Sequence, residues 1–151
     1  MATLTHRLMH SWFLVSRPMT LGARAIVLDR TDRVLLVRHT YVEGWHLPGG
    51  GVEPGETAID CVRREVREEG NVEIAGEVVL HGFYHNQGAS RRDHVALYVC
   101  RVERHLGPKV PDREIAAADF FATDSLPDTV ADGTRRRLEE WRSGARPAPR
   151  W

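Results

Sequence analysis

Three glutamates dominate the chemistry that this sequence offers. Glu65, Glu68 and Glu69 fall at positions i, i+3 and i+4 of a segment that predicts a short helix, Thr57–Gly70. Because an α-helix turns by about 100° per residue, the three carboxylates share one face, with Cβ atoms roughly 5–6 Å apart, and they repel one another. Converging carboxylates with no lysine nearby in the sequence suit a hard divalent cation, Mg²⁺ or Mn²⁺. The spacing therefore indicates a metal site.

The place of Glu69 on this helix supports that interpretation. Ala58, Ile59, Val62 and Val66 form the core-facing stripe, and Glu69 projects at the edge of the stripe rather than toward solvent. A carboxylate at such a position needs a counter-charge.

The alternative is a solvated acidic helix end that pairs with Arg63 and Arg64. The segment before the helix argues against it. Residues 48–55 contain four glycines and two prolines, which specify a rigid, tightly folded loop and bring backbone carbonyls close to the helix. The whole unit is typical of one that positions a ligand.

The complete pattern from Gly50 to Val72 resembles the Nudix box. Every position matches except Asn71, where the family has a glycine. Asparagine is the next-best residue for the left-handed conformation of a helix C-cap, and Gly70 is the other candidate for that role. The resemblance implies an α+β fold, an α/β/α sandwich with a mixed β-sheet between helices.

The same resemblance implies an activity and a set of roles. It implies a Mg²⁺-dependent hydrolase, with Mn²⁺ as a substitute, that cleaves a pyrophosphate bond in a nucleoside diphosphate linked to another moiety. The metal would lie on Glu65, Glu68, Glu69 and the carbonyl oxygen of Gly50, and Glu56 would be held by Arg64 so that the turn and the helix are locked together. The proton acceptor would be Glu65 or an acid from a later loop, for which Glu114 is the candidate.

Two rival functions follow from the same family. One is a non-catalytic Nudix-fold module that binds a nucleotide or regulates, which would be expected to have lost box acids; this chain has lost none. The other is an RNA 5′-end pyrophosphohydrolase. Lysine plus arginine equals aspartate plus glutamate at 21 each, so no overall basic field predicts nucleic acid as a partner.

Candidate substrate contacts lie outside the box. Arg91, Arg92 and Lys109 could grip phosphates, and Trp45 could stack on a base. The alternatives are ordinary surface charges and, for Trp45, core packing; for Glu114 the alternative is a solvated loop charge.

The chain length of 151 residues predicts one domain, residues 19–144, with an N-terminal extension 1–18 and a flexible tail 145–151. The apolar run Trp12–Val15 is too short to span a bilayer. It predicts a short helix or strand laid against the domain or a second subunit, and it is compatible with a homodimer. Two cysteines, Cys61 and Cys100, fit packing residues in a reducing cytoplasm.

Hydrophobic patterning predicts the elements around the box. A hairpin of two strands comes first, then the box helix, a second hairpin, a short strand and a final helix. The expected strands are Leu21–Leu28, Val34–Val37, Val72–Tyr84, His94–Arg101 and Ala117–Ala122, and the final helix is Thr134–Arg142.

Overall fold

A six-stranded mixed sheet forms the centre of the computed structural model, which describes residues 4–151. Residues 1–3 of the predicted extension lie outside that part. The strands are β1 (Thr20–Leu28), β2 (Arg33–His39), β3 (Gly49–Gly51), β4 (Val72–His85), β5 (Asp93–His105) and β6 (Ile115–Ala122). Their order is β4-β5-β1-β2-β6, with β3 beside β1. The β1–β5 pair is parallel and the other pairs are antiparallel.

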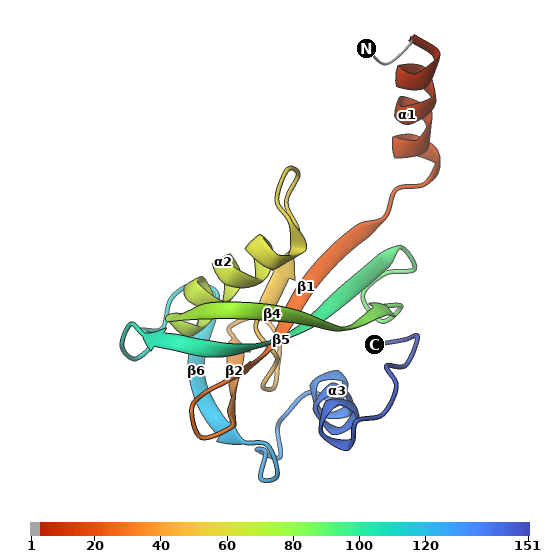
Figure 1. The fold of residues 1–151 in the computed structure, drawn as a ribbon. Coiled ribbons are helices and arrows are strands. Elements are labelled where there is room, and N and C mark those ends of the chain that lie inside the picture. The colour runs from red at the N-terminus through yellow and green to blue at the C-terminus, as the bar shows by residue number, and fades with distance from the viewer. Residues whose placement is uncertain (1–3) are drawn as a thin grey trace.

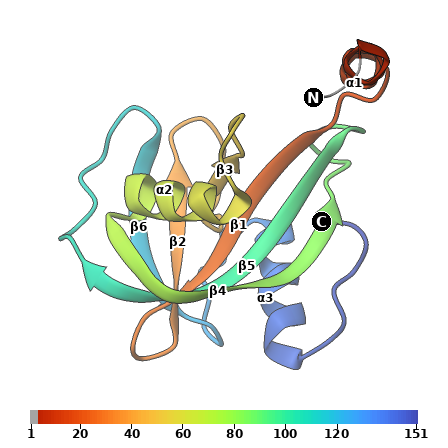
Figure 2. The ribbon, with the colours of Figure 1, turned by 45° about the horizontal axis from the view of Figure 1, so that its top comes forward.

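Two helices cover opposite faces of this sheet (Figures 1 and 2): α2 (Ala58–Gly70) and α3 (Asp132–Ser143). The side chains of β1 alternate between two cores because successive residues of a strand point to opposite faces. Ala25 and Val27 pack in the core that contains Val62 of α2, whereas Ile26 packs in the core that contains Leu138 of α3. This explains the continuous apolar run in β1, and the predicted sandwich is confirmed.

The first predicted hairpin is confirmed, and its turn is held by one side chain. Leu28 of β1 pairs with Val34 of β2. The Asp29 carboxylate accepts hydrogen bonds from the backbone N–H groups of Thr31, at 2.8 Å, and Arg33, at 3.0 Å. Such an aspartate turn closes the chain locally, so the two buried strands enter the sheet in a fixed register.

Helix α2 begins and ends at capping residues. The Thr57 hydroxyl accepts from the N–H of Asp60 at 3.1 Å and donates to the Asp60 carboxylate at 2.6 Å. At the other end Asn71 has φ 53° and ψ 39°, so asparagine takes the left-handed position. Gly70 remains helical and packs closely on Leu35. One stripe residue was predicted wrongly: Ile59 is exposed, because Cys61 takes the core position instead.

The two ends of the chain pack differently. Helix α1 (Leu4–Ser16) projects away from the body (Figure 1), and Trp12 and Leu14 are 67% and 74% exposed. The segment is therefore a helix that does not lie against the domain, and its contact with a second subunit stays a prediction. Residues 145–151, expected to form a flexible tail, are packed instead. The Trp151 and Tyr84 rings lie almost perpendicular to each other with their centroids 5.5 Å apart, and the Ala148 N–H donates to Glu140 at 2.8 Å.

No helix within residues 4–151 is long and apolar enough to cross a membrane.

Candidate functional site

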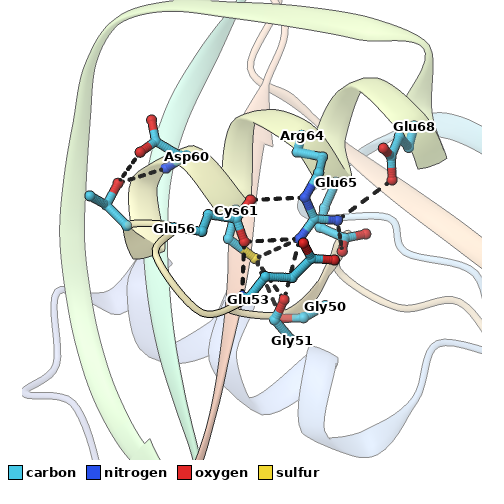
Figure 3. Close-up of polar contacts among 10 residues, drawn as sticks. Gly50, Gly51, Glu53, Glu56, Asp60, Cys61, Arg64, Glu65 and Glu68 are labelled. Atoms are coloured by element: carbon cyan, nitrogen blue, oxygen red, sulfur yellow. Dashed lines mark hydrogen bonds and ion pairs between the residues drawn. The ribbon is translucent and has the colours of Figure 1, made fainter.

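Arg64 locks the glycine-rich turn to helix α2 (Figure 3). Its Nε and Nη2 donate to the two carboxylate oxygens of Glu56 at 2.8 and 3.1 Å, and its Nη1 donates to Glu65 at 2.7 Å. The Arg64 guanidinium holds the pKa of Glu56 down at about 2. Nη2 also donates to the carbonyl oxygen of Gly51 at 3.3 Å. A two-pronged arginine–carboxylate pair fixes orientation as well as charge, so the pairing implied for Glu56 and Arg64 is present.

Glu65 lies where a side chain on Gly50 would be. A Cβ built on Gly50 would meet the Glu65 Oε1 at 2.3 Å, closer than any real contact. Gly50 belongs to β3 and Glu65 to the middle of α2, so the missing side chain lets the carboxylate approach the strand backbone. Burial raises the pKa of Glu65, and Arg64 opposes that rise.

Glu69 is the buried member of the three acids, as its place beside the stripe predicted. It is 8% exposed, and its Oε2 accepts from the N–H of Gly49 at 2.9 Å. Its Oε1 lies 3.7 Å from Nε2 of His39. Burial raises the pKa of Glu69 to about 7, the Gly49 hydrogen bond opposes the rise, and Glu65 adds to it. Half-buried Arg24 supplies the positive charge that a buried carboxylate at the position of Glu69 was predicted to need.

The three acids line one cleft of about 360 Å³ with the segment that leads into β6. Its lining residues are Glu65, Glu68, Glu69, Asp112, Arg113, Glu114 and Ile115. Five of the seven are acidic, so the cleft favours cations. Glu114, the predicted later acid, is therefore brought to the box acids, although it lies 45 positions after Glu69 in the sequence.

The cleft has the donor chemistry of a hard-cation site without a finished coordination shell. Carboxylate oxygens are the ligands that Mg²⁺ and Mn²⁺ prefer. Across residues 4–151, no three histidine, cysteine, aspartate or glutamate side chains are already gathered closely enough to hold an ion. Glu65 is instead held by Arg64, Glu69 by Gly49, and Glu68 is 62% exposed. The donors fit a divalent cation. To bind it, Glu65 would have to turn away from Arg64, and Glu69 would have to turn away from Gly49.

Three predicted substrate contacts lie away from the cleft or serve the fold. Arg91 and Arg92 lie in the loop between β4 and β5, near the start of β1, and neither lines the acidic cleft. Trp45 packs edge-on against Phe121 at 4.8 Å between ring centroids, within the core on the α3 side. This contact is the packing that the alternative for Trp45 describes.

One residue beside the acids, Arg24, carried no sequence signal. Arg24 sits within an apolar strand run, and its Nη1 donates to the carbonyl of Leu47 at 2.8 Å. Tyr41 is exposed beside the cleft, and burial, Glu69 and Glu114 together raise the pKa of its hydroxyl. Burial raises the pKa of the Cys61 thiol to about 11, which fits the packing role predicted for it. Only the fold brings Arg24 and Tyr41 to the acids.

This arrangement, a glycine turn locked by arginine to an acidic helix beside a mixed sheet, defines a class of protein that the comparisons identify. Residues 18–141 match the NUDIX domain family. A Bacillus subtilis (strain 168) protein named "Putative 8-oxo-dGTP diphosphatase" is 31% identical over 127 residues, which cover 83% of this chain and 82% of that protein. An ADP-ribose pyrophosphatase structure from Streptococcus suis has a TM-score of 0.65 at 26% identity, over 82% of this chain and 92% of that one.

A NUDIX hydrolase structure from Nitrosomonas europaea has a TM-score of 0.70 at 23% identity, over 85% of this chain and 91% of that one, and it shows the same fold. The chain belongs to the NUDIX domain family. The prediction of a Nudix-type hydrolase that acts on phosphorus-containing anhydrides is confirmed at that level.

Proposed function

We propose that the acidic cleft hydrolyses a pyrophosphate bond in a nucleoside diphosphate linked to another moiety. One observation carries the proposal: all the box acids are present, and the fold places Glu65, Glu68 and Glu69 in one cleft with Glu114. The names of the relatives, which mention 8-oxo-dGTP and ADP-ribose, support this substrate class.

The residues that would hold a divalent ion are Glu65, Glu68, Glu69 and the carbonyl oxygen of Gly50. We propose Mg²⁺, with Mn²⁺ as a substitute, because the side-chain donors are hard oxygens. When bound, the ion would offset phosphate charge and make a water molecule more acidic.

The remaining roles fall to the chain itself. Arg64 is held by its pair with Glu56 and in turn fixes the position of the Glu65 carboxylate, which the other acids of the cleft would repel. For the proton acceptor, Glu65 and Glu114 remain the candidates. The Glu65 carboxylate is already engaged by Arg64 and is a proposed ligand of the ion, whereas Glu114 is exposed in the cleft and has neither task, so we favour the Glu114 carboxylate.

A substrate panel tests the proposal. Purified protein would be incubated with 8-oxo-dGTP, dGTP, ADP-ribose, a sugar nucleotide, a dinucleoside polyphosphate and 5′-triphosphate RNA, each with Mg²⁺, Mn²⁺ or EDTA. Release of phosphate or monophosphate would be compared between wild type and Glu68→Gln. We expect one class to turn over only with metal, and turnover to collapse in the variant. Binding without turnover of any substrate would instead support the non-catalytic module, and preference for the RNA would support the 5′-end activity.

Three further expectations remain proposals. We propose a single domain over residues 19–144 with the extension 1–18. Free cysteines, Cys61 and Cys100, both buried, support a cytoplasmic location. The exposed apolar side chains of α1 support contact with a second copy of the chain.

A further inference from the structure

The segment between β5 and β6, residues 106–114, forms a strap from the end of helix α2 to the acidic cleft. We propose that Lys109 is a positioning residue: it fastens this strap to the carboxyl end of α2 and so holds Glu114 toward the box acids. The inference rests on the proposed function, because it gives Lys109 a part in the same reaction.

Lys109 is unlike the other basic residues of the chain. It is the only lysine, beside 20 arginines. Its side chain is 12% exposed, whereas lysine side chains are mostly exposed in proteins. Its Nζ donates to the backbone carbonyl of Glu68 at 2.8 Å and to the Asp112 carboxylate at 2.5 Å. A compact ammonium with three donors suits such a junction better than the planar arginine fork.

Asp112 passes this fastening on to Glu114. While its Oδ2 accepts from Lys109, its Oδ1 accepts from the backbone N–H groups of Glu114 at 2.9 Å and Ile115 at 2.8 Å. The carbonyl of Glu114 in turn accepts from the N–H of Thr40 at 2.9 Å, at the end of β2. The backbone of Glu114 is thus fixed on both sides, and its side chain lines the cleft.

Asn71 fastens the other end of the strap. Its carbonyl accepts from the N–H of Leu106 at 3.0 Å, and its Nδ2 donates to the carbonyl of Gly107 at 3.1 Å. The second bond needs the asparagine side chain, which the glycine usual at this position of the Nudix box lacks. The departure from the box pattern therefore adds a tie between the acidic helix and the strap.

A simpler role for Lys109 is to cap the helix, because Glu68 belongs to the last turn of α2 and lysine often binds such carbonyls. Capping alone affects stability and does not depend on Glu114. The two roles therefore differ in whether the effect of replacing Lys109 requires the Glu114 carboxylate.

A double-mutant cycle separates them. Steady-state kcat and KM would be measured with the preferred panel substrate and Mg²⁺ for wild type, Lys109→Met, Glu114→Gln and the double variant. We expect Lys109→Met to lower kcat by about 10- to 100-fold, with KM changed less than about threefold, and to have little further effect once Glu114 is replaced. Val110→Ala, at a neighbouring strap residue that is 76% exposed, is the matched control and should behave as wild type.

Equal fold-losses in both Glu114 backgrounds would overturn the proposal and leave Lys109 as a helix cap. Asn71→Gly, which keeps the left-handed backbone and removes only the side-chain tie, should lower kcat in the same Glu114-dependent way, by about threefold.

A second readout does not depend on activity. Lys109→Met should speed hydrogen exchange at the amides of Glu114 and Ile115, which donate to Asp112, and leave amides in β1 unchanged. If wild type turns over no substrate, the proposed function fails while this measurement still tests the strap. Unchanged exchange at both amides would overturn the positioning role.

Discussion

Gly50 and Gly51 are neighbours in β3 that offer a matched test of how the site is built. Neither has a positive φ, so alanine fits the backbone at both positions. A Cβ at Gly50 would meet the Glu65 Oε1 at 2.3 Å and its Cδ at 2.7 Å, whereas a Cβ at Gly51 meets nothing within 4 Å. Gly50→Ala should therefore displace the carboxylate, and Gly51→Ala should not.

The size of the effect follows from the distance. Ordinary van der Waals contact begins near 3.4 Å, so the Glu65 carboxylate must move by roughly 1 Å to accommodate the methyl group. A misplacement of about 1 Å in a catalytic group costs about 100-fold in rate, or about 2.7 kcal/mol of transition-state stabilisation. We expect kcat/KM to fall by about that factor in Gly50→Ala and to change less than about twofold in Gly51→Ala.

The assay is Mg²⁺-dependent turnover of the preferred panel substrate, with thermal unfolding of both variants measured in parallel. Glu65 can rotate away at little cost to the fold, so we expect similar unfolding temperatures. Wild-type turnover by Gly50→Ala, or an equal loss in Gly51→Ala, would refute the inference that the missing side chain of Gly50 makes room for the Glu65 carboxylate.

Three other predictions follow from the contacts around α2. Arg64→Lys keeps the charge but loses the two-pronged bond to Glu56, so we expect kcat to fall by about 10-fold or more in the same assay while the urea midpoint changes little; an unchanged kcat would contradict the lock. The pKa of Glu69 in the folded protein is about 7, against a usual value of 4.5. Between these pH values, with EDTA present, the folded protein therefore holds a proton that the unfolded chain releases. The contribution of Glu69 to the free energy of unfolding is present below pH 4.5 and is lost as the pH rises to about 7. Urea unfolding from pH 4.5 to 8 should show this slope in wild type and a flatter one in Glu69→Gln; equal slopes would refute it. Gly70→Ala places a Cβ 2.5 Å from the Leu35 Cδ2, so despite the better helix propensity of alanine we expect a net loss of about 1–2 kcal/mol in chemical denaturation, and a stabilised variant would show that Leu35 repacks freely.

The sequence was most informative where the interactions are local. The position of Glu69 beside the apolar stripe depends on residues within a few positions, so helical geometry sufficed to predict it, and the left-handed C-cap was narrowed to Asn71 or Gly70. Residues 25–28 of β1 are all buried, and strand periodicity directs their successive side chains alternately into the two cores.

Residues brought together by the sheet were harder to predict. Glu114 reaches the cleft because β6 pairs with β2, where His39 lies opposite Ile115, and no local pattern contains that pairing. Arg91 looked equally suited to bind phosphate, yet its loop lies near the start of β1. The contact between Trp45 and Phe121 joins residues 76 positions apart in the sequence. Only the fold shows which of the candidate residues line the acidic cleft.

The most direct test of the central claim is the Mg²⁺-dependent rate at which glutamate-to-glutamine variants hydrolyse the pyrophosphate bond of the preferred substrate. Glu65→Gln, Glu68→Gln and Glu69→Gln would be compared with Glu139→Gln, an exposed glutamate on α3 that serves as the control. We predict losses of about 100-fold or more for the three cleft variants and none for the control. Wild-type rates in two of the three cleft variants would contradict the assignment of hydrolysis to these carboxylates.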